Sequence, residues 1–533
     1  MKTLLFQILA LAATMTSTAV ASAAETNAYP GPEPLNRTIS ADLHTVQGPM
    51  NRMAEFCVGA GRANEGLRAD WQRQLTQVHR ELGFRYIRFH GLFCDDMGVY
   101  FEDKHGNPEY NWQYIDQLFD FQHSIGMKPF VELGFMPSAL ASGPQTIFWW
   151  HGNVTPPKDM KKWVGLVSAF VQHCRERYGA AEVRTWYFEV WNEPNLSGFF
   201  TGTQKQYFQL YAATARAIKA IDPELKVGGP ATAGCAWIQD MIDFCSKNHV
   251  PIDFISTHAY ATMSGFLDAN GSAGTIFSPD RNSITDGVQA ARKTISHSTL
   301  PNLELHFTEW SSSYTPSDPL HDCYQSAPFI LDKIKHIGAD AQSMSYWTFT
   351  DIFEEAGPRL TPFHGGFGML NYEDIAKPSY YAYQFLNRLG PIQLVCNDDE
   401  SFICADHRGG VQALFWDFTI CKPNPPANDQ VYYLKDLPPT HSGTAHLKLA
   451  GLAPGRYALT LRKVGYRIND AFSTYRDLGS PSQLTRAEVN YIRDVNNGAP
   501  LLRELVNVGA DGRFSRDFQL RENDVCFVTL EPL

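Results

Sequence analysis

The sequence predicts an α/β protein, in which a (β/α)8 TIM barrel is followed by a C-terminal antiparallel β-sandwich. Between residues 55 and 350, eight short apolar runs alternate with longer segments of helical periodicity. After about residue 390, short segments that alternate between apolar and polar residues replace this pattern. The length of 533 residues also exceeds one ordinary domain and suits a large barrel with a smaller unit attached.

The N-terminal segment has the pattern of a signal rather than of a folded element. Lys2 precedes an apolar run from Leu4 to Ala13, and small residues that end at Ala23 follow. This order is typical of a secretory signal peptide over residues 1–23 and predicts a secreted or periplasmic protein. A membrane anchor is the alternative, but the run is too short to span a bilayer.

The eight apolar runs supply the barrel strands of a predicted catalytic domain, residues 51–390. They begin at Glu55, Tyr86, Lys128, Trp186, Lys226, Phe254, Leu303 and Ser343. Continuous apolar runs of this length are typical of strands that are buried on both faces. Eight strand–helix units in series, each returning by a crossover, predict a closed parallel barrel.

Residues 391–533 are predicted to form the accessory β-sandwich. Alternating segments begin at Val411, Val431, Ala445, Arg456 and Val525. One helix interrupts them, with a capping box formed by Thr485 and Glu488 and a stop at Gly498. In the N-terminal segment 24–50, the stretch from Arg37 to Val46 also alternates and could add a strand to this sandwich.

Composition narrows the classes of partner and cofactor. The net charge is −11 and no basic tract occurs, which argues against nucleic acid. No CxxC pair, HExxH motif or clustered His/Cys spacing appears, so we expect neither a metal nor a cofactor. Ten cysteines permit a few disulfides in an oxidising compartment, and Cys396 with Cys404 is the best candidate pair.

Two glutamates arrive at the rim where such barrels carry their working side chains. The fourth run ends in WNEPN with Glu193, and the seventh ends in HFTEW with Glu309. A single glutamate is more often a helix cap or a surface ion pair, but two at one rim, flanked by Asn, Trp and His, favour a catalytic pair. Glycosidic cleavage needs one protonated acid and one ionised carboxylate.

With these motifs, the chain resembles the family 39 glycoside hydrolases, whose best-known members are β-xylosidases and α-L-iduronidases. The resemblance runs from about Cys57 to Tyr383. It rests on CVGAGRA at Cys57, RFHGLFCDDMG at Arg88, ELGFMP at Glu132, WNEPN at Trp191, THAY at Thr257, FTEW at Phe307, YWTFTDIFEE at Tyr346 and FHGGFGML at Phe363. It implies a retaining mechanism, with Glu193 as acid/base, Glu309 as nucleophile, and their carboxyls about 5 to 5.5 Å apart.

Further candidates come from the ends of the other strands. Asn192 is placed to bind the substrate 2-hydroxyl, and Tyr260 could orient the nucleophile. His90 and His258 would bind sugar hydroxyls, as their family counterparts do, although each alone would more often be a core histidine. The apolar walls Trp347, Phe135 and Trp310 complete the set, in which Trp347 most resembles the family's sugar platform and any of the three could be core.

Arg88 has the strand parity of His90 and should point into the barrel, where a cation must be paired. It is the expected partner of Glu309. Glu132 and Glu189 also have inward parity and compete for it, so a purely structural role for Arg88 stays open.

Glu354 and Glu355, just past the eighth strand, indicate the substrate. Two acids can accept hydrogen bonds from a neutral sugar but would repel a uronic carboxylate. We therefore expect a secreted retaining exo-glycosidase, a β-xylosidase that releases xylose from xylo-oligosaccharides. Other neutral glycones containing arabinose or galactose, and a non-catalytic carbohydrate-binding barrel, are the alternatives. An oligosaccharide is the expected partner, a membrane is not, and a homo-oligomer is left open.

Overall fold

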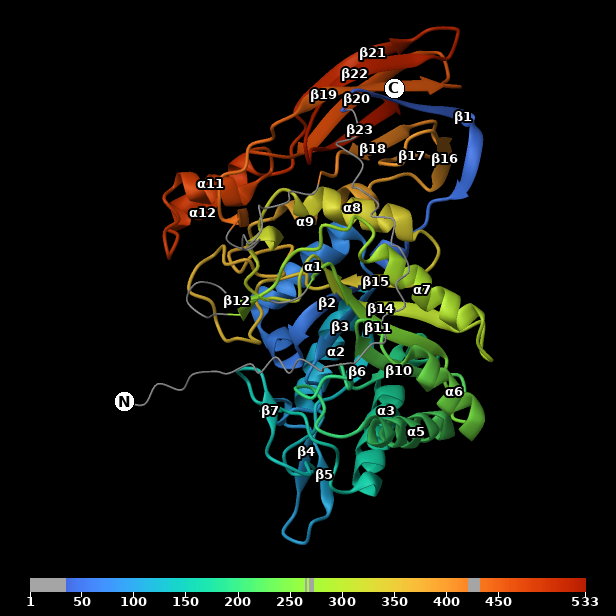
Figure 1. The fold of residues 1–533 in the computed structure, drawn as a ribbon, viewed down its shortest axis with the longest axis vertical. Helices are drawn as coiled ribbons and strands as arrows, with labels where there is room; N and C mark the ends of the chain where they lie inside the picture. Colours follow the sequence, from blue (N-terminus) through green and yellow to red (C-terminus); the bar gives the residue numbers. More distant parts are fainter. Residues whose placement is uncertain (1–34, 264–265, 268–272, 420–431) are drawn as a thin grey trace, which may run out of the picture. The chain divides into compact units, whose positions relative to one another are not determined.

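Eight parallel strands close into a barrel, as the sequence predicted (Figure 1). This computed structural model describes residues 35–263, 266–267, 273–419 and 432–533, so the predicted signal peptide lies outside the described residues. Around the barrel the order is β10-β11-β14-β15-β2-β3-β6-β9. The strands are β2 (Cys57–Arg62), β3 (Tyr86–His90), β6 (Lys128–Leu133), β9 (Tyr187–Val190), β10 (Lys226–Ala233), β11 (Phe254–Tyr260), β14 (Glu304–Ser311) and β15 (Ser343–Tyr346).

Helices follow the barrel strands along the chain. They are α1 (Ala69–Leu82), α2 (Gln113–Ser124), α3 (Met160–Tyr178), α5 (Gln204–Ile221), α6 (Ile238–Asn248), α7 (Thr285–Ser296), α8 (Ser326–Ile337) and α9 (Pro378–Asn387). Side-chain caps start two of them: Asp159 accepts from two backbone N–H groups of α3, and Thr203 forms a capping box with Gln206 at α5. Among the described residues, none of the helices is both long and apolar enough to cross a bilayer.

Short elements occupy the loops between these strands and helices. They are β4 (Tyr100–Glu102), β5 (Pro108–Tyr110), β7 (Thr146–Ile147), β8 (Gly152–Asn153), β12 (Phe266–Leu267), β13 (Ala273–Gly274), α4 (Ala180–Val183) and the 3-10 turns η1 (Met53–Glu55), η2 (Ala63–Leu67), η3 (Asp95–Met97) and η4 (Pro319–His321). The hairpin β7–β8 has its tip at Phe148, whose ring stacks on that of His90 with centroids 5.9 Å apart. The loop after β6 therefore takes part in the carboxyl end of the barrel.

An aromatic cluster fills the amino-terminal end of the barrel. Side chains from the starts of five strands form it: Cys57, Tyr86, Phe130, Tyr187 and Phe254. His306 lies against the rings of Tyr187 and Phe254 and is itself buried. Because this end is packed with side chains, the ends of the strands at the opposite, carboxyl side are where a substrate can enter.

A nine-stranded sheet forms the accessory unit, in the order β21-β20-β23-β18-β17-β16-β1-β19-β22. The strands are β1 (Arg37–Pro49), β16 (Ile392–Cys396), β17 (Ser401–Ala405), β18 (Val411–Trp416), β19 (Ser442–Ala450), β20 (Gly455–Val464), β21 (Leu502–Val508), β22 (Phe514–Arg521) and β23 (Val525–Pro532). The pair β1–β19 is parallel, and the other pairs are antiparallel. One apolar core joins residues from both halves of the sheet, such as Leu447, Phe518, Phe415 and Val528.

Two helices accompany this sheet, α11 (Ala471–Asp477) and α12 (Arg486–Val495). The predicted capping box is present, because the Thr485 hydroxyl accepts from Glu488 N–H and the Glu488 carboxylate accepts from Thr485 N–H. Stacking of Phe385 on Phe527, with centroids 5.1 Å apart, joins α9 of the barrel to β23 of the sheet.

The predicted strand that begins at Val431 is wrong in its described part. Tyr432 and Tyr433 lie in a helical turn, and Val431 itself lies outside the described residues. Side chains of the barrel take up the backbone carbonyls of this segment: Cys323 donates to Tyr433 O and Tyr324 donates to Leu437 O. Contacts with the barrel therefore replace the ladder that the alternation predicted.

The predicted disulfide between Cys396 and Cys404 is also wrong, because both thiols are free. Cys404 is the cross-strand partner of Gln393 in the antiparallel pair β16–β17, three residues away from Cys396. The Cys396 thiol instead lies 3.2 Å from the hydroxyl of Ser401. The register of the two strands keeps the two sulfur atoms apart.

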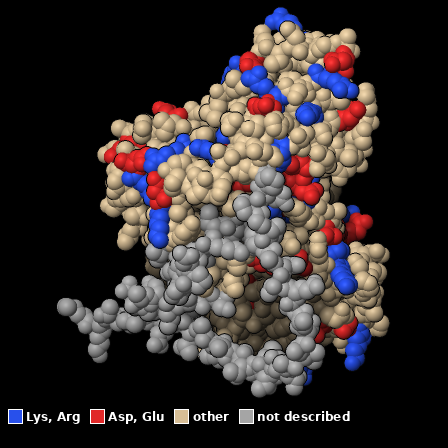
Figure 2. Space-filling view, turned by 45° about the horizontal axis from the view of Figure 1, so that its top comes forward, with Lys and Arg blue, Asp and Glu red and all other residues tan. Residues whose placement is uncertain are grey.

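Charged side chains of both signs are interspersed on the face drawn in Figure 2. This distribution agrees with the absence of a basic tract in the sequence.

Candidate active site

Glu193 and Glu309 meet at the carboxyl end of the barrel. Glu193 follows β9, and Glu309 belongs to β14. One oxygen of each carboxylate and one ring nitrogen of His258 all lie within 4.8 Å of one another. Both glutamate side chains are nearly buried, with 10% and 7% of their surface exposed. The two carboxylates are therefore close enough to act on opposite sides of one glycosidic bond.

Glu309 is surrounded by donors. Its Oε1 accepts from Arg88 Nη1 at 2.6 Å and its Oε2 accepts from the Tyr260 hydroxyl at 2.7 Å. Arg88 is fully buried and also bonds Glu189 at 2.7 Å and Glu132 at 2.9 Å. Arg88 thus contacts all three of the carboxylates that competed for it in the sequence, and it stabilises the ionised form of Glu309.

Glu193 has a different environment. Burial raises its pKa from 4.5 to about 7. Its Oε1 lies 2.8 Å from Nδ1 of His258, and burial lowers the pKa of that imidazole to about 4. Near neutral pH His258 is therefore uncharged and gives Glu193 no cationic partner, so the proton of Glu193 is retained.

Asn192, His90 and His258, which were predicted to bind the sugar, each have one polar side-chain atom bonded to another protein residue. Asn192 Oδ1 accepts from Arg88 Nη2 at 2.8 Å. Because the oxygen faces Arg88, the NH2 group of Asn192 points away from the guanidinium. His90 bonds Glu132 through Nδ1 at 2.7 Å, and its Nε2 lies 3.6 Å from Glu309. The Nε2 atom of His258 is buried without a partner among the described residues. In each residue one polar atom is fixed by the protein, and the other is left for a ligand.

Two of the predicted aromatic walls, Trp347 and Phe135, pack against His90 and other buried residues. The ring of Trp347 lies 4.9 Å from His90, and a Cβ on Gly59 would come within 2.4 Å of that indole, so glycine is required there. Phe135 is fully buried against His90 and Trp191. These two aromatic side chains support the pocket by holding His90 in place.

Trp310, the third predicted wall, is core. It has no exposed surface and packs on Phe329 and Tyr346, at centroid distances of 6.1 and 5.7 Å. Its neighbour Glu309 points into the barrel, and alternation along β14 turns Trp310 outward.

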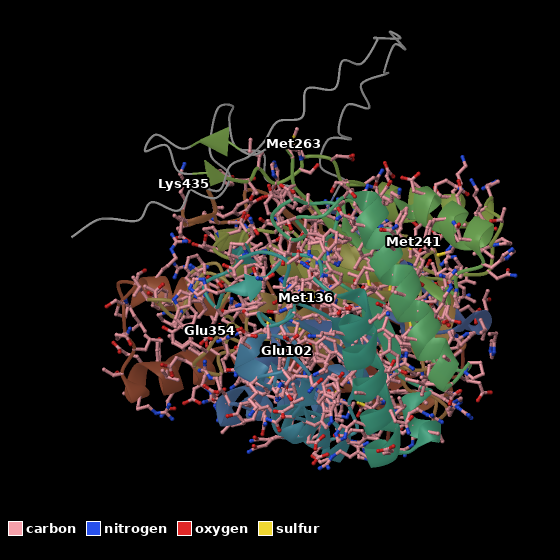
Figure 3. The ribbon with its side chains drawn as sticks, turned by 90° about the horizontal axis from the view of Figure 1, so that it is seen from below. Glu102, Met136, Met241, Met263, Glu354 and Lys435 are labelled. Atoms are coloured by element: carbon pink, nitrogen blue, oxygen red, sulfur yellow. The ribbon has the colours of Figure 1, made fainter. Side chains whose placement is uncertain are left out.

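The acidic pair after β15 splits into two roles. Glu355 Oε1 lies 3.6 Å from His90 Nε2, and burial together with the charge of Glu309 raises the pKa of Glu355 well above 4.5. Glu354, labelled in Figure 3, is ion-paired through one oxygen to Arg62 at 2.7 Å and through the other to Arg68 at 3.0 Å. Both carboxylate oxygens of Glu354 are thus engaged by arginines, and its direct contact with the sugar stays a prediction.

A charged network behind Glu354 was missed at the sequence level. Glu65 is buried and accepts from the backbone N–H groups of Arg62 and Glu354. Burial and the charge of Glu354 raise the pKa of Glu65 to about 8. The clustering of Arg62, Glu65 and Arg68 directly after the first strand was the available signal, because that position is also at the rim.

Glu193, His258 and Glu309 are the residues whose spacing could hold a metal ion in the described part of the chain. Both oxygens of Glu309 already accept from Arg88 and Tyr260. A cation placed there would compete with a buried guanidinium, so this donor set fits a metal poorly.

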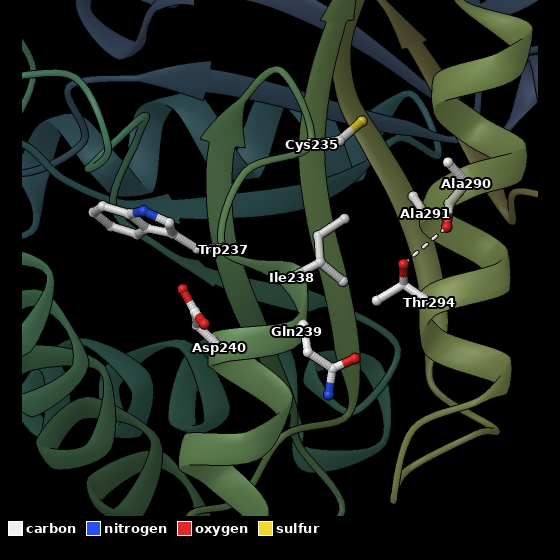
Figure 4. Close-up of a pocket in the computed structure, with 8 residues that line it drawn as sticks. All are labelled: Cys235, Trp237, Ile238, Gln239, Asp240, Ala290, Ala291 and Thr294. Carbon is white, nitrogen blue, oxygen red and sulfur yellow. Dashed lines mark hydrogen bonds between the residues drawn. The ribbon is translucent and has the colours of Figure 1, made fainter. Parts of the chain in front are cut away.

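A cavity of about 270 Å³ lies away from these residues, between the start of α6 and the middle of α7 (Figure 4). Apolar side chains predominate among the residues that line it: Cys235, Trp237, Ile238, Gln239, Asp240, Ala290, Ala291 and Thr294. None of the residues expected in the active site borders it. Its wall begins two residues after Ala233, the last residue of β10.

Comparison with known proteins agrees with this geometry. Residues 38–514 match the model of the family described as glycosyl hydrolases family 39. The chain is 48% identical over 344 residues to a β-xylosidase of Caldicellulosiruptor saccharolyticus, which covers 64% of this chain and 70% of that one. It is 43% identical over 377 residues to a β-xylosidase of Geobacillus stearothermophilus, covering 69% and 74%.

Solved structures resemble nearly the whole chain. A β-xylosidase of Caulobacter crescentus CB15, described as monomeric, has a TM-score of 0.89 and 43% identity, with 93% of this chain and all of that one covered. The family 39 enzyme of Xanthomonas axonopodis pv. citri has a TM-score of 0.90 and 45% identity, with coverage of 96% and 100%.

Proposed function

Because this chain belongs to family 39 of the glycosyl hydrolases and is a glycoside hydrolase, we propose that it is a retaining exo-β-xylosidase. It would release xylose from the non-reducing ends of xylo-oligosaccharides. The observation that carries the proposal is the pair Glu193 and Glu309, which lie within 4.8 Å of each other in environments that favour opposite protonation states. A separation this short agrees with the carboxyl groups of retaining enzymes, which lie about 5 to 5.5 Å apart, rather than with the roughly 6.5 to 9.5 Å of inverting ones.

The reaction follows from these two environments. Glu193 donates its proton to the glycosidic oxygen while Glu309 attacks the anomeric carbon, which breaks the bond to the leaving group and forms a glycosyl–enzyme ester. Glu193, now ionised, takes a proton from water, whose oxygen attacks the same carbon and releases Glu309. The NH2 group of Asn192 would donate to the 2-hydroxyl as positive charge develops on the ring.

Two observations support a neutral pentose as the glycone. The curated relatives at 43 to 48% identity are β-xylosidases. The pocket side of the site also carries Glu355 beside His90, which offers a carboxyl group for hydrogen bonds with sugar hydroxyls but no positive charge to pair with a uronic acid.

We also propose that the enzyme is exported. The support is the sequence pattern of residues 1–23, a basic residue, an apolar run and small residues in order. A polysaccharide-derived substrate outside the cytoplasm agrees with such a location.

A panel of aryl glycosides tests the glycone and the chemistry together. The wild-type enzyme should hydrolyse aryl β-xylosides faster than the matching arabinosides, galactosides and iduronides. Glu309→Ala should abolish hydrolysis of every substrate, whereas Glu193→Ala should retain cleavage of aryl xylosides whose leaving group needs no proton. Wild-type turnover by Glu309→Ala would refute the assignment, and binding without turnover by the wild type would indicate a carbohydrate-binding barrel.

NMR of the first-formed product tests the stereochemistry. Double displacement predicts that β-xylose appears before its α anomer. Initial release of the α anomer would contradict the retaining mechanism even if the xylosidase activity is present.

A further inference from the structure

The backbone that carries the acid/base residue is held in an uncommon conformation. Trp191 has φ +72° and Glu193 has φ +44°, both in the left-handed region that non-glycine residues seldom adopt. Such a conformation is strained and persists only where surrounding contacts hold it. The direction of the Glu193 carboxyl therefore depends on whatever fixes this turn.

The end of β10 supplies one of these contacts through a bulge. The register between β10 and β11 shifts between Pro230 and Thr232, and Ala231, at the shift, has φ +53°. The displaced carbonyl of Ala231 accepts from the backbone N–H of Glu193 at 2.8 Å. The bulge thus presents to the acid/base residue an acceptor that a regular ladder would have used for its neighbour strand.

The side chain of Asn195 supplies the other two contacts. Its Oδ1 accepts from Ala233 N–H at 2.9 Å, and its Nδ2 donates to Ala233 O at 3.1 Å. The Glu193 carbonyl accepts from Leu196 N–H at 2.9 Å, which closes a tight turn around Asn195. The amide of Asn195 makes both bonds because it carries a donor and an acceptor on two different atoms, whereas an ionised Asp could only accept and Leu could do neither.

The residue that follows β10, Gly234, also contacts His258, which is the side-chain partner of Glu193. Gly234 N–H donates to His258 O at 3.1 Å, and the imidazole of His258 contacts Glu193 at 2.8 Å. Residues 231–234 therefore help to fix Glu193 in two ways: its backbone directly, through Ala231, and its carboxylate indirectly, through His258.

We propose that Asn195 is a positioning residue, whose two hydrogen bonds to Ala233 aim the Glu193 carboxyl at the glycosidic oxygen. The inference rests on the proposed function, in which Glu193 is the general acid. It predicts a defect in proton donation and leaves intact the attack by Glu309, which neither Asn195 nor Ala233 contacts in the described structure. A general defect of folding would slow both steps alike.

Asn195→Asp tests the proposal, because it preserves size and the acceptor oxygen but removes the donor to Ala233. The measurement is kcat/KM for aryl xylosides whose leaving groups range from dinitrophenol, which departs unaided, to phenol, which needs a proton. We expect a fall of at least about tenfold for the phenyl substrate and of less than about threefold for the dinitrophenyl substrate. Asn195→Ala, which removes both bonds without adding charge, should show the same contrast.

Asn469→Asp, in the connection between β20 and α11, is a matched control. The Asn469 side chain also accepts from one backbone N–H, of Gly498 at 2.9 Å, and donates to one carbonyl, of Lys463 at 2.7 Å. It should leave the dependence on leaving group unchanged. An equal loss on both substrates in the Asn195 variants, or no loss on the phenyl substrate, would overturn the proposal.

Failure of the proposed function would look different. If the wild type cleaves no aryl xyloside, the β-xylosidase assignment fails by itself. The same leaving-group series is then measured on the aryl glycoside that the wild type does cleave, so the contrast still decides the role of Asn195.

Discussion

Replacing Glu193 by glutamine should raise the stability of the protein at neutral and alkaline pH. Burial raises the pKa of Glu193 from 4.5 to about 7 in the folded chain. Between these values the unfolded chain releases a proton that the folded chain keeps, so ionisation favours unfolding. Its effect on stability is nil below about pH 4.5, grows as the pH rises, and is complete above about pH 7. Glutamine has the shape of the protonated acid and cannot ionise.

The magnitude follows from the displacement of the pKa. One pKa unit corresponds to about 1.4 kcal/mol, so a rise from 4.5 to about 7 lowers the free energy of unfolding above pH 7 by up to about 3 kcal/mol. The Glu193 side chain is only 10% exposed, so water does little to reduce this effect. Glu193→Gln should recover most of it.

Thermal unfolding of both proteins, followed from about pH 4 to pH 8, is the assay. The difference between their midpoints should be small at the acid end, rise towards pH 7 in favour of Glu193→Gln, and then stay constant. Glu176→Gln, an exposed position on α3, removes the same charge from the surface and should give no such trend. A midpoint difference that is the same at pH 4 and pH 8 would refute the reasoning, because burial would then not be what holds the proton.

Three further predictions concern the neighbours of the pair. Tyr260→Phe removes a donor to Glu309 and should lower kcat on an aryl xyloside about 10- to 100-fold; an unchanged kcat would contradict this role. Arg88→Met leaves three buried carboxylates without their cation and should lower the free energy of unfolding by about 3–5 kcal/mol, measured as a lower thermal midpoint; a midpoint equal to that of the wild type would exclude this. Glu355→Gln should raise KM at least about tenfold, whereas Glu354→Gln should lower the thermal midpoint with little change in KM; the reverse pattern would exchange their roles.

The barrel could be predicted because its strands carry a strong local signal. Each of the eight apolar runs became one of the barrel strands, since strands buried on both faces need continuous apolar side chains. The wrong prediction of a strand at Val431 could not be avoided from the sequence, because the segment alternates between apolar and polar residues as a strand does. Its conformation instead depends on contacts with Cys323 and Tyr324, which lie more than 100 residues earlier in the chain. The distance between Cys396 and Cys404 likewise depends on a register that no local pattern states.

The sequence could predict which site residues lie at strand ends and which side chains point into the barrel, but not which of them contact one another. Parity places Arg88, Glu132 and Glu189 inside the barrel, but it cannot say which carboxylate a long side chain meets, and the structure shows Arg88 on both of these and on Glu309. Glu354 and Glu355 are adjacent and chemically identical, but Glu354 faces two arginines at and after the end of the first barrel strand, whereas Glu355 faces His90. Arg62 and Arg68, from the other end of the barrel sequence, decide that difference.

The two catalytic candidates differ because a single buried cation is unequally shared. Arg88 bonds Glu309 directly, whereas the carboxyl of Glu193 contacts a nitrogen of His258, whose pKa burial lowers to about 4. A neutral imidazole gives Glu193 no positive charge that would favour loss of its proton, whereas the guanidinium of Arg88 and the hydroxyl of Tyr260 stabilise negative charge on Glu309. Glu193 should therefore hold its proton beside an uncharged imidazole between about pH 4, below which His258 becomes a cation, and about pH 7, above which Glu193 ionises. Within that window the proton needed for cleavage and the charge needed for attack lie on different residues.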